Sequence, residues 1–493
     1  MDDYTECDAT ELAARVARNE VSSLALVELA IAAIERVDPQ LNAVVHRMYD
    51  DARALANGPL PEGPFRGVPM VVKDFDGYVR GAPFTASCRL LEGFVPDHDS
   101  EAIARLRRAG FIFVAKTNCP EFALLGTTEP AWRGPTRNPY DLERSTGGSS
   151  GGSAALVAAG AVAIGHGGDG GGSLRIPASH CGLVALKPTR GRVPLGPDHG
   201  EGWGGYVQWG VLTRSVRDTA ALLDVLGGPM PGDPYAAPAL PGPLLAEVGR
   251  DPGKLCIGFF PGSLLGREVD SQHAAAVTEI AARLQALGHH VEPAKPDIDR
   301  DALAHAYLVQ VASSTAAEVA EFGRLAARKP TAELFEAETW FMHQVGRATS
   351  AVDLIEARAT AQVAGRATAA FHTRYDLFLC ATTAYPPIRI GELALNAPQR
   401  IALAALRKAP IGAVLQRALN VFAPSFLERT PNTQLFNQTG QPAISLPLAQ
   451  TREGMPIGIQ LAAAVGGEDL LIRIASQLEV TQPWHARRPR VVA

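Results

Sequence analysis

The sequence predicts an α/β fold in which helices cover a β-sheet. Stretches with helical periodicity alternate with short apolar runs along the chain, and this alternation is typical of such a fold. The chain has 493 residues, of which 46% are hydrophobic and 20% are charged. That composition is ordinary for a globular protein, and the length is sufficient for a large core.

The first half of the chain contains clear boundary signals. Two amphipathic helices are expected within residues 9–37, the second beginning near Ser22 and ending before Pro39. Gly110 closes an expected helix over 101–109. The remaining elements expected here are strands over 68–73, 111–115, 161–165 and 183–186, and a helix over 153–159.

The second half continues the alternation. Ser215 with Asp218 three residues later marks a helix start. Strands are expected over 255–260, 377–381, 443–446 and 457–461, and helices over 271–287, most of 301–373 and 468–479. The Pro- and Gly-rich segment 227–253 is either a linker or a long surface connection. We prefer the connection, because no complete second sheet is expected after it.

Composition also bears on partners and location. The net charge is −5 and no basic run occurs, which argues against a nucleic-acid partner. No apolar stretch is long enough to predict a membrane span, and the first residues do not resemble a signal peptide. The six cysteines lack CxxC spacing, which suits free thiols in a reducing compartment and predicts a cytoplasmic protein.

Two serines stand in one glycine-rich region. Ser149 lies in the sequence STGGSSGGS, and Ser173 follows 24 residues later in GGDGGGSLRIP. Dense glycine usually means that the backbone adopts a shape other residues cannot. A serine in such backbone can present its hydroxyl to an electrophile with free N–H groups beside it.

Other motifs fit this region less well. Residues 165–170 match the dinucleotide pattern GxGxxG, but Pro177 interrupts the helix that should follow. Residues 147–151 match the hydrolase elbow GxSxG, but no apolar strand precedes them. A flexible linker would not be followed at once by an alanine-rich helix. Lys73 ends an apolar run, where a lone lysine is more often a solvated charge.

The sequence around Lys73 favours a functional role for this lysine instead. The segment FRGVPMVVKD at 65–74 places Lys73 76 residues before Ser149. With it occur KTN at 116–118, GPTRNP at 134–139, GLVALKPT at 182–189 and FNQTGQPAIS at 436–445. Together these segments resemble the amidase signature family, over residues 11 to about 479. The resemblance implies one domain over 1–493 with a mixed, twisted sheet covered on both faces. It also implies a signature core at 65–190 and pocket and lid insertions at 227–430.

The resemblance also implies roles for individual residues. Ser173 would be the nucleophile, and Lys73 would be the base. Ser149, after a cis Gly148–Ser149 peptide, would carry the proton between them. An amine accepts a proton only in its neutral form, which burial favours. The N–H groups of Gly170, Gly171, Gly172 and Ser173 would form the oxyanion hole. We further expect Asp169 to hold this loop, and Arg175 to form a structural ion pair.

The function implied is hydrolysis of an aryl, alkyl or oligomeric amide, or a carbamate, through an acyl-enzyme on Ser173 without metal or cofactor. The partner would be a small-molecule amide, and the family allows a homodimer. Gly170 replaces the threonine usual in the family's Asp-Thr-Gly-Gly-Ser, which resembles the branch containing the 6-aminohexanoate cyclic dimer hydrolases. The alternatives are a subunit similar to glutaminyl-tRNA amidotransferase A, and a non-catalytic binding protein on the same scaffold.

The apolar segment 401–427 is broken by Pro410 and Gly412. Its apolar spacing is that of a core helix, whereas its breaks would suit a mobile lid over an acyl pocket. In the lid interpretation, Ile411, Val414 and Phe422 would contact the substrate.

Overall fold

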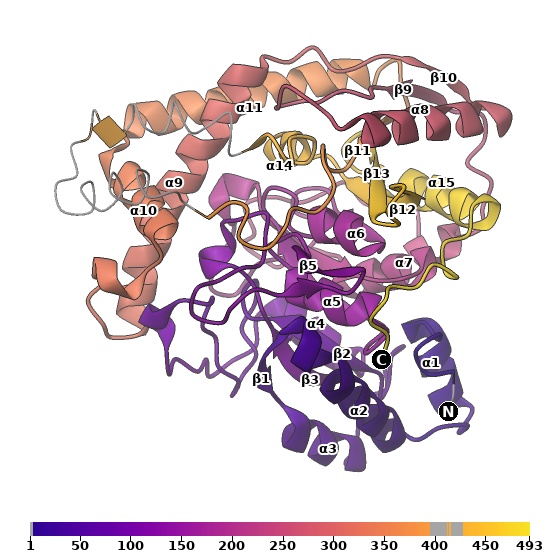
Figure 1. Cartoon of the computed structure of the whole chain (residues 1–493), viewed down its shortest axis with the longest axis vertical. Coiled ribbons are helices and arrows are strands. Elements are labelled where there is room, and N and C mark those ends of the chain that lie inside the picture. The colour runs from indigo at the N-terminus through magenta and orange to yellow at the C-terminus, as the bar shows by residue number, and fades with distance from the viewer. Residues whose placement is uncertain (1–2, 395–411, 413, 416–426) are drawn as a thin grey trace.

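A computed structural model describes residues 3–394, 412, 414–415 and 427–493. Figure 1 shows its helices arranged around two neighbouring sheets. The helices are α1 Ala9–Ala17, α2 Ser23–Leu41, α3 Tyr49–Asn57, α4 Glu101–Arg108, α5 Gly151–Ala158, α6 Arg175–Cys181, α7 Val216–Leu226, α8 Ser271–Ala286, α9 Arg300–Leu325, α10 Ala337–Ala348, α11 Ala351–Phe371, α14 Gln434–Thr439 and α15 Glu468–Thr481. Short 3-10 turns occupy Arg89–Leu91, Glu121–Ala123, Trp203–Gly205, Leu244–Glu247 and Ala332–Leu334.

The first sheet has five strands. Their spatial order is β1 Val44–Arg47, β3 Ile112–Thr117, β2 Pro69–Lys73, β6 Gly165–Asp169 and β8 Gln208–Leu212. The central strand β2 runs parallel to β3 and β6, and the outer pairs are antiparallel. Every residue of β2 is buried. Lys73, the last residue of this strand, therefore lies in the interior of the protein.

The second sheet has six strands. Their order is β10 His290–Pro293, β9 Cys256–Phe259, β11 Leu377–Ala381, β13 Pro456–Ala463, β12 Ala443–Gln450 and β7 Ala185–Lys187. A reciprocal pair of hydrogen bonds between Val184 and Thr213, of 2.9 and 3.1 Å, joins the ends of the two sheets. The strands thereby form one continuous mixed arrangement, beside which β4 Arg137–Asn138 and β5 Asp141–Ser145 form a small hairpin.

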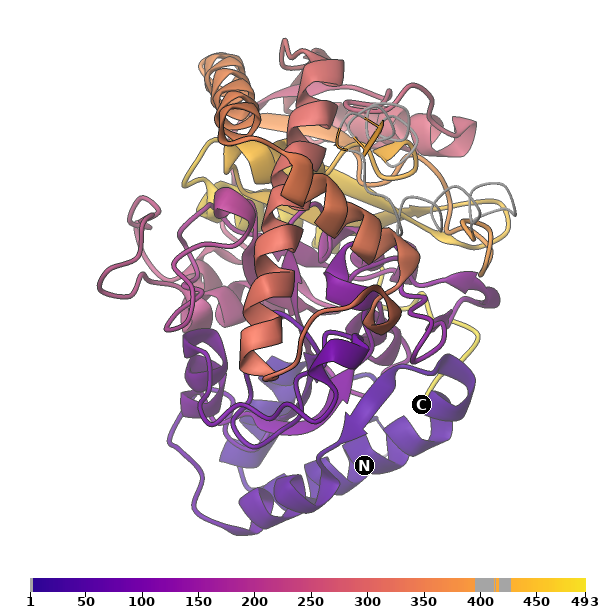
Figure 2. The same ribbon diagram turned by 90° about the vertical axis from the view of Figure 1, so that its left-hand side faces the viewer.

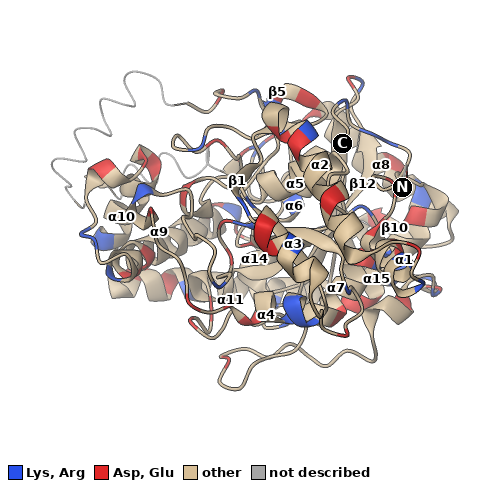
Figure 3. Ribbon diagram, turned by 90° about the horizontal axis from the view of Figure 1, so that it is seen from below, with Lys and Arg blue, Asp and Glu red and all other residues tan. Residues whose placement is uncertain are grey.

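Helices complete the layers, as the alternation in the sequence predicts. In Figure 1, α1, α2 and α3 lie at the end of the molecule that holds the first sheet, and α8 and α15 lie beside the second. Figure 2 shows the salmon helices α9 and α10 lying across the N-terminal half. Acidic and basic positions are scattered over the helices in Figure 3. Some of them form ion pairs, such as Arg53 of α3 with Glu28 of α2 at 2.7 Å. None of the described helices combines the length and the apolarity that crossing a membrane requires.

The prediction that the second helix ends before Pro39 is wrong. Helix α2 continues to Leu41, which is fully buried, and Pro39 lies inside its last turn. A proline there removes one hydrogen bond of the helix. After the helix end, Asp38 accepts hydrogen bonds from the N–H groups of Ala43 and Val44, at 2.7 and 2.9 Å, and so holds the chain that leads into β1.

The strand expected over 161–165 is displaced. Ala161 instead lies in the turn that closes α5, where its N–H donates to the Leu156 carbonyl at 2.9 Å. The strand that follows is β6, with the sequence GHGGD. Glycine has low strand propensity, so the sequence did not predict a strand here. The strand forms because its backbone pairs with β2 and β8.

The segment 227–253 connects the two sheets within one fold. Our reason for preferring a connection is wrong, because a six-stranded sheet does follow. Five of its strands come from residues after 253, and β7 comes from before. The second sheet is therefore completed by a strand of the first half, which a sequence scan by segments does not reveal.

Candidate active site

Lys73, Ser149 and Ser173 converge on one cavity. Its volume is about 410 Å³, and all three residues line it. Lys73 is fully buried at the end of β2, and its Nζ donates a hydrogen bond to Ser149 Oγ at 2.8 Å. Ser149 follows a cis peptide bond after Gly148, as the resemblance implies, and stands in the turn before α5. Ser173 precedes α6 and is half-buried.

The Lys73 amine has a second partner that the sequence analysis missed. Asp76 lies three residues further on and accepts a hydrogen bond from Lys73 Nζ. Asp76 is buried and also lines the cavity. The amine is therefore held between a carboxylate and the Ser149 hydroxyl, and its direction is fixed. The spacing of acid and lysine in KDFD is the only sequence signal for this contact.

A different buried lysine lies nearby and does not reach the cavity. Lys116 ends close to Asp74, with 3.6 Å between Nζ and Oδ1, and its Nζ has no hydrogen-bond partner among the described residues. Burial lowers the pKa of Lys116, with the Asp74 charge opposing it. Lys116 is not among the lining residues, so Lys73 is the lysine that a substrate would meet.

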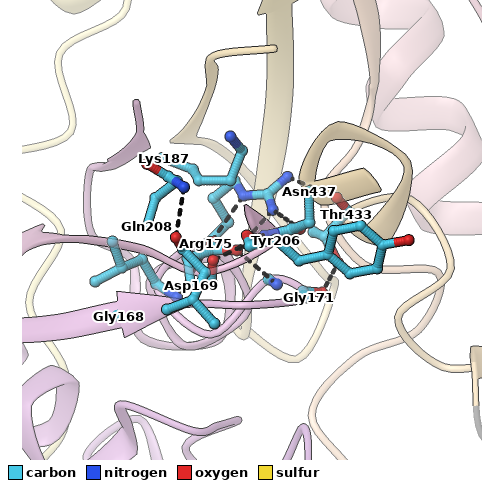
Figure 4. A network of polar contacts seen from close by, with 12 residues as sticks. Gly168, Asp169, Gly171, Arg175, Lys187, Tyr206, Gln208, Thr433 and Asn437 are labelled. Carbon is cyan, nitrogen blue, oxygen red and sulfur yellow. Dashed lines mark hydrogen bonds and ion pairs between the residues drawn. The ribbon is translucent and has the colours of Figure 1, made fainter. Parts of the chain in front are cut away.

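An ion pair holds the glycine-rich loop that carries Ser173. The Arg175 guanidinium donates to both carboxylate oxygens of Asp169, at 2.8 and 2.9 Å, and both side chains are fully buried. Figure 4 shows this pair with Asn437 beside it. Burial acts to raise the pKa of Asp169, but the charge and hydrogen bonds of Arg175 lower it to about 2. The expected roles of Asp169 and Arg175 are confirmed.

The loop geometry revises the expected oxyanion hole. The N–H of Gly172 donates to Asp169 Oδ1 at 2.7 Å, so it is not free for a substrate oxygen. Gly172 has φ +125°, which other residues adopt only with strain. Its contribution is therefore the shape of the loop. Gly170 lines the cavity and Gly171 does not.

The far part of the chain supports this loop. Thr433 Oγ1 donates to the Gly171 carbonyl at 2.6 Å, and Asn437 Nδ2 donates to the Asp169 carbonyl at 2.8 Å (Figure 4). Gln460 of β13 accepts from Arg175 at 2.7 Å. Of these three, only Asn437 belongs to a segment quoted above for the resemblance, and no local pattern connects Thr433 or Gln460 to residue 171 or 175.

One wall of the cavity comes from helices α9 and α11. Gln310, Ser313, Ser314 and Glu318 of α9 line it, with Arg358 of α11.

Most residues of the segment 401–427, including Ile411 and Phe422, lie outside the described part of the chain. Of its described part, Val414 is exposed and Leu415 is buried.

Known proteins match this chain along nearly its whole length. A family profile described as Amidase matches residues 25–472. A 6-aminohexanoate-cyclic-dimer hydrolase of Paenarthrobacter ureafaciens is 39% identical over 98% of this chain and 97% of its own length. Among solved structures, a 6-aminohexanoate cyclic dimer hydrolase complexed with substrate has a TM-score of 0.90 at 36% identity, covering 99% of this chain and 100% of that one.

A bacterial aryl acylamidase is also similar in structure, with a TM-score of 0.84 at 25% identity, over 97% of this chain and 96% of that one. With the family match and the 39% identity, the conclusion is that this chain belongs to the amidase signature family and is an enzyme that hydrolyses amides.

Proposed function

We propose that Ser173 attacks the amide carbonyl and forms an acyl-enzyme, with Ser149 and Lys73 as a proton relay. The observation that carries this proposal is the 2.8 Å hydrogen bond between Lys73 and Ser149 inside the cavity that Ser173 lines. A serine hydroxyl is a weak nucleophile until a base removes its proton. A second hydroxyl lets the buried amine act on Ser173 from a distance.

The reaction has an acylation stage and a hydrolysis stage. Ser173 Oγ bonds to the carbonyl carbon while its proton passes to Ser149 Oγ, whose own proton passes to Lys73 Nζ. The C–N bond then breaks, and the proton returns through Ser149 to the leaving amine. Water attacks the acyl-enzyme by the same relay and releases the carboxylic acid.

Backbone donors would stabilise the charge on the carbonyl oxygen. The N–H groups of Gly170, Gly171 and Ser173 have no acceptor among the described residues. Of these three residues, Gly170 and Ser173 line the cavity and are the nearer donors, whereas Gly171 does not line it. Gly172 is excluded by its bond to Asp169. Removing one such donor in a hydrolase typically costs about 2.7–4 kcal/mol of transition-state stabilisation.

The test is covalent labelling of the nucleophile. A phosphonyl fluoride should label Ser173 in mass spectrometry, and Ser173→Ala should lose both label and turnover while staying folded. Ser313→Ala is the matched control, because Ser313 lines the same cavity and its hydroxyl donates to the Val309 carbonyl of its own helix. Labelling of Ser149 in an active Ser173→Ala enzyme would overturn the assignment.

The substrate class we propose includes aryl, alkyl and oligomeric amides, and carbamates, whose carbonyl carbon is open to the same attack. Release of amine by the purified chain alone would separate a hydrolase from an amidotransferase subunit and from a binding protein. The proposal includes a homodimer, which analytical ultracentrifugation would test.

A further inference from the structure

The cavity is lined by five carboxylates: Asp76, Asp198, Glu201, Glu318 and Glu321. Four have a basic partner, namely Lys73 for Asp76, His98 for Asp198 at 2.9 Å, Arg358 for Glu201 at 3.4 Å and His199 for Glu321 at 3.6 Å. Glu318 differs, because its Oε1 accepts from the Trp203 indole N–H at 3.0 Å and its buried Oε2 accepts from no described residue.

A second unused acceptor lies on the same face of α9. Gln310 is 5% exposed and lines the cavity, and its Oε1 has no hydrogen-bond partner among the described residues. Its Nε2 donates to Ser314 at 3.1 Å. Positions 310, 314 and 318 are four residues apart, so they follow one face of the helix. This face offers oxygens that lack donors.

An ammonium group matches this face. It carries three N–H donors and a positive charge. Burial raises the pKa of the Glu318 carboxyl to about 8. A bound ammonium would favour the ionised form of that carboxyl, which accepts charge-assisted hydrogen bonds. Burying an acceptor without a donor is costly, so a ligand that supplies donors gains affinity. An apolar ligand group would leave both oxygens unpaired.

We propose that Glu318 is a specificity-determining residue that binds a cationic amine of the substrate, with Gln310 as a second acceptor. The preferred substrates would then be amides that carry an ammonium group on a chain away from the scissile bond. This inference rests on the proposed function, because it names the substrate class of that same site.

The alternative role for Glu318 is to position Trp203. The Trp203 ring packs so closely on Gly170 that a Cβ there would lie 2.9 Å from it. Loss of the indole bond could therefore disturb the loop before Ser173. Glu318→Gln separates the two roles, since glutamine keeps an oxygen that can accept from the indole but has no charge.

The experiment compares matched substrates. One pair is 6-aminohexanoyl and heptanoyl p-nitroanilide, which place charge on the acyl side. The other is N-(6-aminohexyl)acetamide and N-heptylacetamide, which place it on the leaving side. We expect kcat/KM of the charged member to exceed that of the neutral member by about 10- to 100-fold in at least one pair. Glu318→Gln should bring this ratio close to one, and Glu321→Gln, the matched control, should keep it.

Equal rates within both pairs, or an unchanged ratio in Glu318→Gln, would overturn the inference. A variant in which both members slow equally would show the positioning role instead, and would also overturn it. Calorimetric binding of 6-aminohexanamide and heptanamide provides a readout without turnover. If no amide is hydrolysed but the amine is still preferred in binding, the proposed function fails and this inference stands.

Discussion

Asp76 packs against Gly168 so closely that a Cβ on Gly168 would lie 2.5 Å from the Asp76 Cγ. Gly168 belongs to β6 and Asp76 to the segment after the neighbouring strand β2. Because Asp76 contacts the Lys73 amine, a single glycine of the sheet determines where the amine can lie.

Gly168→Ala should therefore lower kcat without preventing folding. The new methyl would push the Asp76 carboxylate away and move the Lys73 amine from Ser149. Steady-state kinetics and the rate of phosphonyl fluoride labelling measure the effect. Gly365→Ala is the control, because a Cβ there meets nothing within 4 Å. Equal kcat in Gly168→Ala and the control would show that Asp76 does not position Lys73.

Lys73→Arg should be nearly as inactive as Lys73→Ala. A guanidinium stays protonated at any ordinary pH, so it cannot accept the serine proton. The measurement is kcat/KM, with circular dichroism to show that each variant folds. The exposed Lys254→Arg provides the control. An active Lys73→Arg enzyme would remove lysine from the role of base.

Arg175→Gln should lower the free energy of unfolding by about 3–5 kcal/mol, because it leaves the Asp169 charge buried and unpaired. Urea denaturation measures this loss. Asp169→Asn combined with Arg175→Gln should recover part of it, since no unpaired charge remains. Arg53→Ala, which breaks a surface pair with Glu28, should cost about 1 kcal/mol or less. Similar losses in the two single variants would contradict the prediction.

Glu121 should make stability fall as pH rises. It accepts from the Glu336 N–H at 2.8 Å, and burial together with the Glu336 charge raises its pKa to about 8. Between about pH 4.5 and 8 the folded carboxyl keeps a proton that the unfolded one has lost, so rising pH favours unfolding. One such group contributes a slope of at most about 1.4 kcal/mol per pH unit.

Glu121→Gln should reduce this slope, as measured by urea denaturation at several pH values across that window. The substitution keeps an acceptor for the Glu336 N–H, so the contact itself is preserved. A slope identical to that of the unchanged protein would show that Glu121 does not titrate as we expect.

Residues close in sequence were the predictable part of the site. Asp169 and Arg175 lie six positions apart, and we expected a loop held by Asp169 and a structural ion pair of Arg175, although not that the two residues would be each other's partners. The roles of Lys73, Ser149 and Ser173 needed the family resemblance, because nothing in the 75 residues between Lys73 and Ser149 indicates that β2 ends at the turn before α5.

The missed features depend on tertiary contacts. Asp76, Trp203 and Glu318 come from three separate segments that meet only around the cavity. The displaced strand β6 is a case where pairing with its neighbours outweighs poor local propensity. The continuation of α2 past Pro39 similarly reflects the burial of Leu41.

The bond from Thr433 to the Gly171 carbonyl, and those that join Arg175 to Asn437 and Gln460, have a consequence for biosynthesis. A ribosome makes the nucleophile long before it makes these supports. We expect a nascent chain halted before residue 430 to carry every proposed reacting group and still be unable to cleave an amide. Hydrolysis would begin only when the last strands have left the exit tunnel. The growing polypeptide would therefore have no amidase activity until its synthesis is nearly complete.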